Sequence, residues 1–234
     1  MNRTMPVEIW ADLICPWCWI GRHRFERALA AFAHRDRVRL VHRAFRLTPG
    51  LSPEPLDAFM QRRLGSSAQF SAMQAELERA AAAEGLTYDP AGAEVGDTLD
   101  AHRLALFAAP TGRQPQVVER FHRAYFSEHA SLFDRETLIR LAVEAGLDRD
   151  GALSVLYGMT HTQDALVDQV RAQALGAGGA PFFLIDGRIA VSGAQSPGRF
   201  LSALTQAWDL AAPAPEPEDE AAPGGPDVCV TPSP

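Results

Sequence analysis

Hydrophobic positions near the start of the chain follow two different periods. Residues 7–13 form an apolar run rich in β-forming residues, which predicts a buried strand. Residues 15–32 place apolar side chains on one stripe of a helix, and residues 38–45 alternate between two faces as a strand does. The first 46 residues therefore predict one βαβ unit.

The middle of the chain has a helical pattern. Apolar residues recur three and four apart over residues 56–64, 69–84, 98–108, 114–128, 134–145, 148–157 and 163–175. Asp134 and Asp148 are expected to cap two helix starts, and Gly146 and Gly176 to follow two helix ends. Residues 181–186 and 189–192 then predict a β-hairpin, and residues 197–208 predict a last helix.

The order of these elements predicts a discontinuous α/β domain. Residues 1–48 and 177–210 carry the strands, and they enclose an all-helical insertion over residues 49–176. Residues 211–234 hold seven Pro, five acidic residues and no Arg, which predicts a disordered acidic tail.

The charge balance narrows the range of partners. The chain has 22 basic residues against 29 acidic ones, and reading the sequence shows that every basic residue is Arg. A net charge of -7 argues against nucleic acid, which calls for a basic stripe. The absence of Lys excludes Schiff-base chemistry and a P-loop.

The start of the chain gives no sign of export. Residues 1–14 lack a long apolar segment and a small-residue cleavage site, and no run of 18 apolar residues follows. We therefore expect a cytoplasmic protein with no membrane partner. Thiols are kept reduced in that compartment, so a close cysteine pair there is catalytic, sensing or metal-binding rather than structural.

The cysteine pair of residues 15–18, Cys-Pro-Trp-Cys, falls where a predicted strand ends and a helix begins. The unpaired N–H groups and the dipole of a helix start favour a thiolate on Cys15, which we expect to be the exposed nucleophile. Pro16 suits the first helical turn, where its missing N–H costs little. Cys18, one turn further, is expected to be buried and to resolve a mixed disulfide at Cys15.

Two other interpretations of the pair remain open. A Cys-x-x-Cys pair can be half of a zinc site, but the chain offers only Cys229 as a further cysteine, so we expect no metal. Both cysteines could also be ordinary core residues. Cys229 lies in the predicted tail, whose length lets it reach Cys15, and we consider it a candidate regulatory thiol.

A second signal lies late in the chain, where Ala180 and Pro181 open the predicted hairpin. A Cys-x-x-Cys pair at a helix start together with an X-Pro before a late hairpin is typical of the thioredoxin fold. The stretches WADLICPWCWIGRHRFERAL, DTLDAHRLALFA and DQVRAQALGAGGAPFFLIDGRIAVSGAQSP resemble the DsbA-like thioredoxin-fold oxidoreductases, most closely their FrnE-type branch. The resemblance spans about residues 6–208.

The resemblance implies a thioredoxin fold with a large helical insertion and a cis peptide between Ala180 and Pro181. In such proteins the backbone before this proline pairs with an extended substrate segment, so Ala180 would hold a substrate sulfur in line with Cys15. Ala180 stands where the branch commonly has Val. Trp17 and Trp19, expected to be partly exposed, either floor a substrate groove or pack against the insertion.

Three polar residues carry weaker signals. Asp12, three residues before Cys15, is either a proton acceptor during exchange or an ordinary polar group at a strand end. His102 is expected to serve the core or a cap. His122 and His129 share one helical face, with no acidic ligand motif beside them, and are expected at the surface.

These observations predict a cytosolic thiol-disulfide oxidoreductase that uses Cys15 and Cys18 and needs no metal or organic cofactor. Its partner would be a thiol- or disulfide-containing protein or a low-molecular-weight thiol, and a homodimer is left open. The alternatives are a glutathione-dependent isomerase or transferase of the kappa or 2-hydroxychromene-2-carboxylate isomerase type, with glutathione as co-substrate, or a polyketide-biosynthesis isomerase. A non-catalytic holdase is the remaining alternative.

Overall fold

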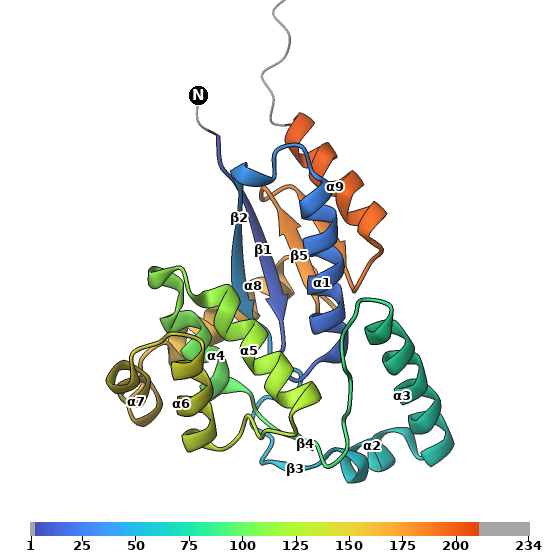
Figure 1. Cartoon of the computed structure of the whole chain (residues 1–234), viewed down its shortest axis with the longest axis vertical. Coiled ribbons are helices and arrows are strands. Elements are labelled where there is room, and N and C mark those ends of the chain that lie inside the picture. The colour runs from blue at the N-terminus through green and yellow to red at the C-terminus, as the bar shows by residue number, and fades with distance from the viewer. Residues whose placement is uncertain (1–2, 211–234) are drawn as a thin grey trace, which may run out of the picture.

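A four-stranded sheet forms the centre of the molecule (Figure 1). The computed structural model describes residues 3–210. The strands follow the order β2-β1-β5-β6, with bounds Met5–Ala11 for β1, Val38–Ala44 for β2, Phe182–Ile185 for β5 and Ile189–Ser192 for β6. Strands β1 and β2 are parallel, whereas β5 pairs antiparallel with both β1 and β6. The predicted βαβ unit and late hairpin are confirmed.

Each face of the sheet has its own apolar layer, because alternate residues of β1 point to opposite sides. Val7 and Ile9 pack with Phe25 of α1 and Phe200 of α9. Helix α1 spans Pro16–Ala31 and α9 spans Pro197–Leu210, and the two lie side by side over this face (Figure 1). Trp10 points to the other face.

Helix α8, Thr162–Ala174, covers that second face of the sheet. Its residue Asp168 accepts hydrogen bonds from the Ala44 backbone N–H and the Arg43 guanidinium, and its carbonyl accepts one from the Trp10 indole. Helix α8 also contacts α4. The division of the chain at residue 176 stays a prediction.

Helices α2 to α7 occupy the lower part of the molecule in Figure 1, toward the end at which β1 stops and α1 begins. Their largest apolar cluster includes Leu104, Phe121 and Leu138 and takes in Trp19 from α1. Two short strands, β3 and β4, pair beside them, and residues 35–37 and 109–111 form 3₁₀ turns. The bounds are Glu54–Pro55 for β3, Leu56–Leu64 for α2, Ser67–Ala82 for α3, Glu94–Val95 for β4, Leu99–Phe107 for α4, Gln114–Ser127 for α5, Arg135–Glu144 for α6 and Arg149–Tyr157 for α7.

The predicted helix ends are also confirmed. The Asp134 side chain accepts a hydrogen bond from the Thr137 N–H, and Asp148 accepts one from the Gly151 N–H. Gly146 and Gly176 have positive φ angles of 92° and 83°, which residues other than glycine rarely adopt. The predicted disordered tail, residues 211–234, lies outside the described residues.

Candidate active site

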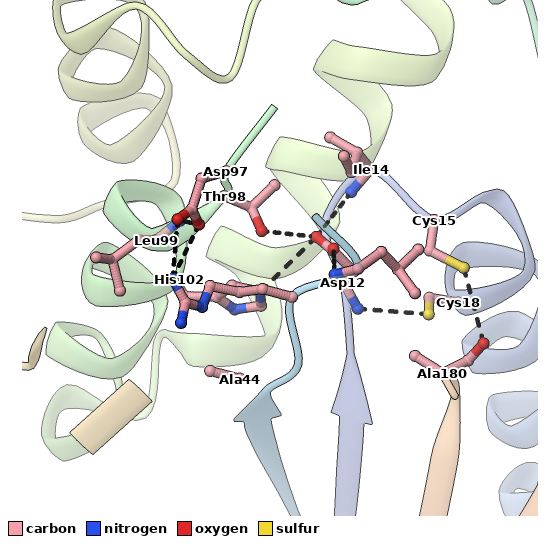
Figure 2. Close-up of polar contacts among 12 residues, drawn as sticks. Asp12, Ile14, Cys15, Cys18, Ala44, Asp97, Thr98, Leu99, His102 and Ala180 are labelled. Atoms are coloured by element: carbon pink, nitrogen blue, oxygen red, sulfur yellow. Dashed lines mark hydrogen bonds and ion pairs between the residues drawn. The ribbon is translucent and has the colours of Figure 1, made fainter. Parts of the chain in front are cut away.

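The two cysteines lie at the junction of β1 and α1 (Figure 2). Cys15 is the N-cap residue of α1, with an extended backbone, and Pro16 occupies the first helical turn as predicted. The Cys15 carbonyl accepts the N–H groups of Cys18 at 3.0 Å and of Trp19 at 3.3 Å, which places Cys18 one turn along the helix. The helix start therefore presents both sulfurs on one side.

Both thiols are covered by protein. Only 4% of Cys15 and 1% of Cys18 is exposed, so the expectation of an exposed Cys15 is wrong. The reason is that Cys15 packs in the apolar layer of α1 and β1, with Trp17 and Ala180 against the same layer. The Cys15 Sγ atom lies 3.9 Å from the Ala180 carbonyl oxygen.

The two thiols differ in their surroundings. Burial raises the pKa of the Cys18 thiol well above its ordinary value, and the adjacent Cys15 thiol raises it further. The Asp12 backbone N–H acts in the opposite direction, because it donates to the Cys18 Sγ atom over 3.4 Å. Cys18 therefore holds its proton until a base removes it.

Asp12 is the buried acid of the site (Figure 2). Its carboxylate accepts hydrogen bonds from the Leu47 N–H at 2.6 Å, the Thr98 hydroxyl at 2.8 Å and the Ile14 N–H at 3.4 Å. Burial outweighs these bonds and raises the pKa of Asp12 from 3.8 to about 6. A carboxyl with this pKa can take up and release a proton near neutral pH.

Two buried histidines flank Asp12. The His102 Nε2 atom lies 3.8 Å from the Asp12 carboxylate, and His122 Nε2 lies 3.4 Å from the Asp12 carbonyl. Burial lowers the pKa of His102 to about 4 and that of His122 to about 3, so both rings are neutral at pH 7. His102 is in the core, as expected. The surface position expected for His122 is wrong, since the residue is 1% exposed and packs against Trp19 and Phe126.

Ala180 and Pro181 face the cysteines from the loop before β5. The peptide between them is cis, as the resemblance implies. The Pro181 carbonyl accepts the Gly193 N–H at 2.8 Å, while the N–H and carbonyl of Ala180 make no backbone hydrogen bond within residues 3–210. The Ala180 N–H is thus free to pair with another extended segment, while the Ala180 carbonyl accepts the Cys15 thiol.

The two tryptophans of the motif have different positions. Trp19 is 2% exposed, stacks on Phe126 at 5.4 Å and donates its indole N–H to Glu119, so it packs against the inserted helices. Trp17 lines a cavity of about 280 Å³ that also reaches Cys15. The expected partial exposure is therefore wrong for Trp19, while Trp17 contributes to a groove.

The expectations about metal binding, membrane helices, Cys229 and His129 have different outcomes. Within residues 3–210, no group of three or more His, Cys, Asp or Glu side chains is arranged to hold a metal ion. No helix in the same range is long and apolar enough to cross a membrane. Cys229 lies outside the described residues, so its role as a regulatory thiol stays a prediction. His129 is at the surface, as expected.

Comparison with known proteins places this geometry in a family. The model of the DSBA-like thioredoxin domain matches residues 6–205. The chain belongs to this family. The expected DsbA-like fold, an α/β thioredoxin fold with a large helical content, is therefore confirmed, while membership of the FrnE-type branch stays a prediction. No match was found among curated proteins.

Solved structures agree with this assignment to the DSBA-like family. A protein described as a probable DsbA oxidoreductase from Streptomyces coelicolor is 42% identical and has a TM-score of 0.86, with 98% of this chain and all of that chain covered. The cytosolic disulfide reductase DsbM from Pseudomonas aeruginosa is 19% identical, with a TM-score of 0.64 over 88% of this chain and all of that chain. A 2-hydroxychromene-2-carboxylate isomerase is 16% identical, with a TM-score of 0.65 over the same shares. The last two show the common fold.

Sequence reasoning missed part of this DSBA-like site. Thr98 lies in the stretch DTLDAHRLALFA, which carried the resemblance, yet its hydroxyl was not singled out as a partner of Asp12. The Leu47 backbone N–H was missed as well. The one available signal for Thr98 was its place at the start of a predicted helix. The Leu47 donor could not be predicted, because every residue except proline carries a backbone N–H.

Proposed function

We propose that this DSBA-like oxidoreductase is a cytosolic enzyme that exchanges thiols and disulfides through Cys15 and Cys18. The observation that carries the proposal is the unequal pair at the helix start. Cys15 caps α1 beside the Ala180 carbonyl, and Cys18 sits one turn deeper against Asp12. Exchange needs such an arrangement, with one sulfur to attack and a shielded sulfur to resolve.

The reaction consumes one disulfide and two protein thiols. The Cys15 thiolate attacks one sulfur of the substrate, its S–S bond breaks, and the first product leaves as a thiolate that takes up a proton. Cys18 then gives its proton to the Asp12 carboxylate and attacks the Cys15 sulfur. The Cys15–Cys18 disulfide forms, and the second product leaves as a thiolate that takes up the proton released by Cys18, so two electrons pass to the substrate. The reverse sequence oxidises a dithiol.

Ala180, Pro181 and Pro16 would position the partner. Neither the N–H nor the carbonyl of Ala180 makes a backbone hydrogen bond within residues 3–210, and the carbonyl accepts the Cys15 thiol. An extended substrate segment that pairs with this main chain as a further strand would hold the attacked sulfur beside Cys15. Pro16 keeps the first turn of α1 in place. The partner is a thiol- or disulfide-containing protein or a low-molecular-weight thiol, and glutathione remains a candidate because DsbM has also been solved with GSH.

Trapping tests the role of each sulfur. The Cys18→Ala variant, incubated with disulfide-bonded insulin, should accumulate a mixed disulfide at Cys15, while Cys15→Ala should form none. The wild-type protein should reduce insulin with a dithiol donor, and both variants should be inactive. A Cys15→Ala protein that retains insulin reduction would contradict the proposal.

A second candidate function rests on the apolar cavity that reaches Cys15. Such a cavity suits a small aromatic substrate, as a glutathione-dependent isomerase or transferase would require. The Cys18→Ser variant separates the two functions, because an isomerase that needs only Cys15 would keep its turnover. Dithiol exchange would instead stop at the mixed disulfide.

A further inference from the structure

The cavity beside Cys15 has the size of a small-molecule site. It encloses about 280 Å³ between the start of α1 and the helices α2 and α3. Small-molecule pockets range from roughly 300 to 1,000 Å³, so this one lies at the lower end. Only 4% of Cys15 is exposed, so a partner must reach the sulfur through a narrow approach. These dimensions suit one arm of a low-molecular-weight disulfide.

Apolar side chains dominate the wall of the cavity. Phe59 and Met60 contribute from α2, Met73 and Leu77 from α3, and Trp17 from α1. Methionine side chains adapt to ligands of different shape, and burying apolar ligand surface against such a wall is favourable. The cavity therefore favours an aliphatic or aromatic arm.

The hydroxyl groups of the wall already have protein partners. Tyr88 donates to the Gln74 side chain at 2.6 Å, Thr48 to the Gly96 carbonyl at 2.8 Å and Tyr125 to the Glu94 carbonyl at 2.5 Å. Besides Arg63, the Gln74 side-chain N–H2 group and the Trp17 indole N–H are the side-chain donors of the wall that have no acceptor within residues 3–210. A ligand rich in peptide groups would therefore recover few of the hydrogen bonds that it loses with water, which is costly. Glutathione is such a ligand.

Arg63 is the one charged residue that lines the cavity. Its guanidinium makes no hydrogen bond or ion pair within residues 3–210, whereas its neighbour Arg62 is paired with Glu54. The unpaired side chain is exposed and can meet the polar end of a ligand. An unpaired guanidinium at the rim of an apolar cavity fits a carboxylate.

The neighbouring surface limits how much negative charge a ligand can carry. A second hollow shares Leu56 and Gln74 with the cavity and is lined by Asp57, Asp89 and Glu94. An arm with several carboxylates would meet these side chains, so a single negative charge placed at Arg63 is the better match.

We propose that the cavity binds one arm of a low-molecular-weight disulfide or thiol, an arm that is apolar along its length and ends in a single carboxylate held by Arg63. The inference rests on the proposed exchange function and names its substrate class. The Cys15 thiolate attacks the substrate sulfur attached to that arm, and the other half leaves as a thiol. Cys18 then attacks the Cys15 sulfur and displaces the bound arm as a second thiol. The two cysteines are thereby oxidised to the Cys15–Cys18 disulfide, and the substrate disulfide is reduced to two thiols.

A matched series of disulfides tests the proposal. The fully reduced protein is mixed with the symmetric disulfides of 6-mercaptohexanoic acid, 6-mercaptohexanol and 6-aminohexanethiol and with oxidised glutathione. For each disulfide, the rate at which the protein thiols are lost is divided by the rate at which the same disulfide oxidises free dithiothreitol. This ratio corrects for the intrinsic reactivity of the disulfide. The acid should react roughly two- to fivefold faster than the alcohol, since an exposed ion pair contributes up to about a factor of five, and the amine should react more slowly than both. Oxidised glutathione should be slower than the acid, and added salt should reduce the preference for the acid.

Adjacent arginines provide the matched control. Arg63→Gln should bring the ratio of acid to alcohol close to one, and Arg63→Lys should keep most of it. Arg62→Gln removes a charge from the same helix but lies outside the cavity wall, so the ratio should stay at the wild-type value. A wild-type ratio near one, or an unchanged ratio in Arg63→Gln, would overturn the inference. Failure of every disulfide, including bis(2-hydroxyethyl) disulfide and insulin, to oxidise the protein would instead overturn the proposed function.

Discussion

The backbone N–H of Asp12 donates a hydrogen bond to the Cys18 sulfur over 3.4 Å, so the buried acid and the deeper thiol are held at one strand end. Burial raises the pKa of both groups, to about 6 for Asp12 and well above its ordinary value for Cys18. At neutral pH the carboxyl is mostly ionised while the thiol keeps its proton. The charged Asp12 raises the pKa of the Cys18 thiol further, and we expect its carboxylate to accept the proton when Cys18 attacks.

The raised pKa of Asp12 predicts how the free energy of unfolding depends on pH. Between pH 3.8 and about 6 the folded protein binds a proton at Asp12 that the unfolded chain has released, so stability falls as the pH rises through this window. The difference of about two pH units corresponds to about 3 kcal/mol. In urea unfolding, the reduced wild-type protein should lose most of this stability between pH 4 and pH 7, and Asp12→Asn should not show the loss. Parallel pH profiles for the two proteins would contradict a buried, proton-binding Asp12.

Asp12→Asn should also slow the attack of Cys18 on the mixed disulfide. The amide cannot accept the thiol proton, and a positioned base typically contributes a factor of about 10² or more. Reduced protein is mixed with excess oxidised glutathione, and the mixed disulfide at Cys15 is followed by mass spectrometry after acid quenching. Its decay in the wild-type protein should accelerate as the pH rises through about 6, and the variant should lose that component.

Asp36→Asn serves as the control for this measurement, because Asp36 is an exposed carboxylate on the 3₁₀ turn before β2, where its neighbour is Arg35. Its decay rate and pH profile should match those of the wild-type protein. An Asp12→Asn protein that resolves the mixed disulfide at the wild-type rate at every pH would show that the proton leaves by another route.

The Thr98 hydroxyl is expected to affect the pKa of the Asp12 carboxyl. This hydroxyl donates to Asp12 at 2.8 Å and lowers the pKa of the acid, so Thr98→Val should move the pH midpoint of mixed-disulfide decay upward. The variant should also lose roughly 1–3 kcal/mol of stability at pH 8, where the carboxylate is charged and its partner is gone, and less at pH 5. Thr98→Ser keeps the hydroxyl and should restore the midpoint. A midpoint that is the same for valine and serine would contradict the role given to this hydrogen bond.

The helices could be predicted closely because the buried face of each one appears in the sequence as apolar residues three and four apart. Helix α6 was expected over residues 134–145 and spans Arg135–Glu144, since an apolar period, an Asp cap and a glycine stop all mark it. Strands β3 and β4 were missed because a pairing of two residues each is too short to show any period. The face covered by α8 was also beyond prediction, since it depends on contacts between Asp168 and a strand more than a hundred residues away.

In the candidate site, the local motif could be predicted, whereas its surroundings could not. Cys15, Pro16 and Cys18 follow from a local motif at a strand-to-helix junction. Their burial does not, because the loop of Ala180 and the helices α2 and α3 reach the motif only in the folded chain. The sequence predicts His122 at the surface because no acidic ligand motif lies beside it, whereas in the structure α5 packs on both α1 and α6.

Gly21 lies in α1 where this helix packs against the loop that holds Pro181. A β carbon at this position would lie 3.1 Å from the backbone and side chain of Ala194 and 3.1 Å from the Pro181 ring, closer than such atoms normally approach. Gly21→Ala should therefore push the loop away from Cys15, lower kcat/KM for insulin reduction by about tenfold and cost roughly 1–3 kcal/mol in urea unfolding. Gly178→Ala adds the same carbon a few residues before Pro181, where no atom lies within 4 Å, and should leave both quantities close to wild type. Equal effects from the two substitutions would show that the contact between α1 and the Pro181 loop does not set the geometry of the site.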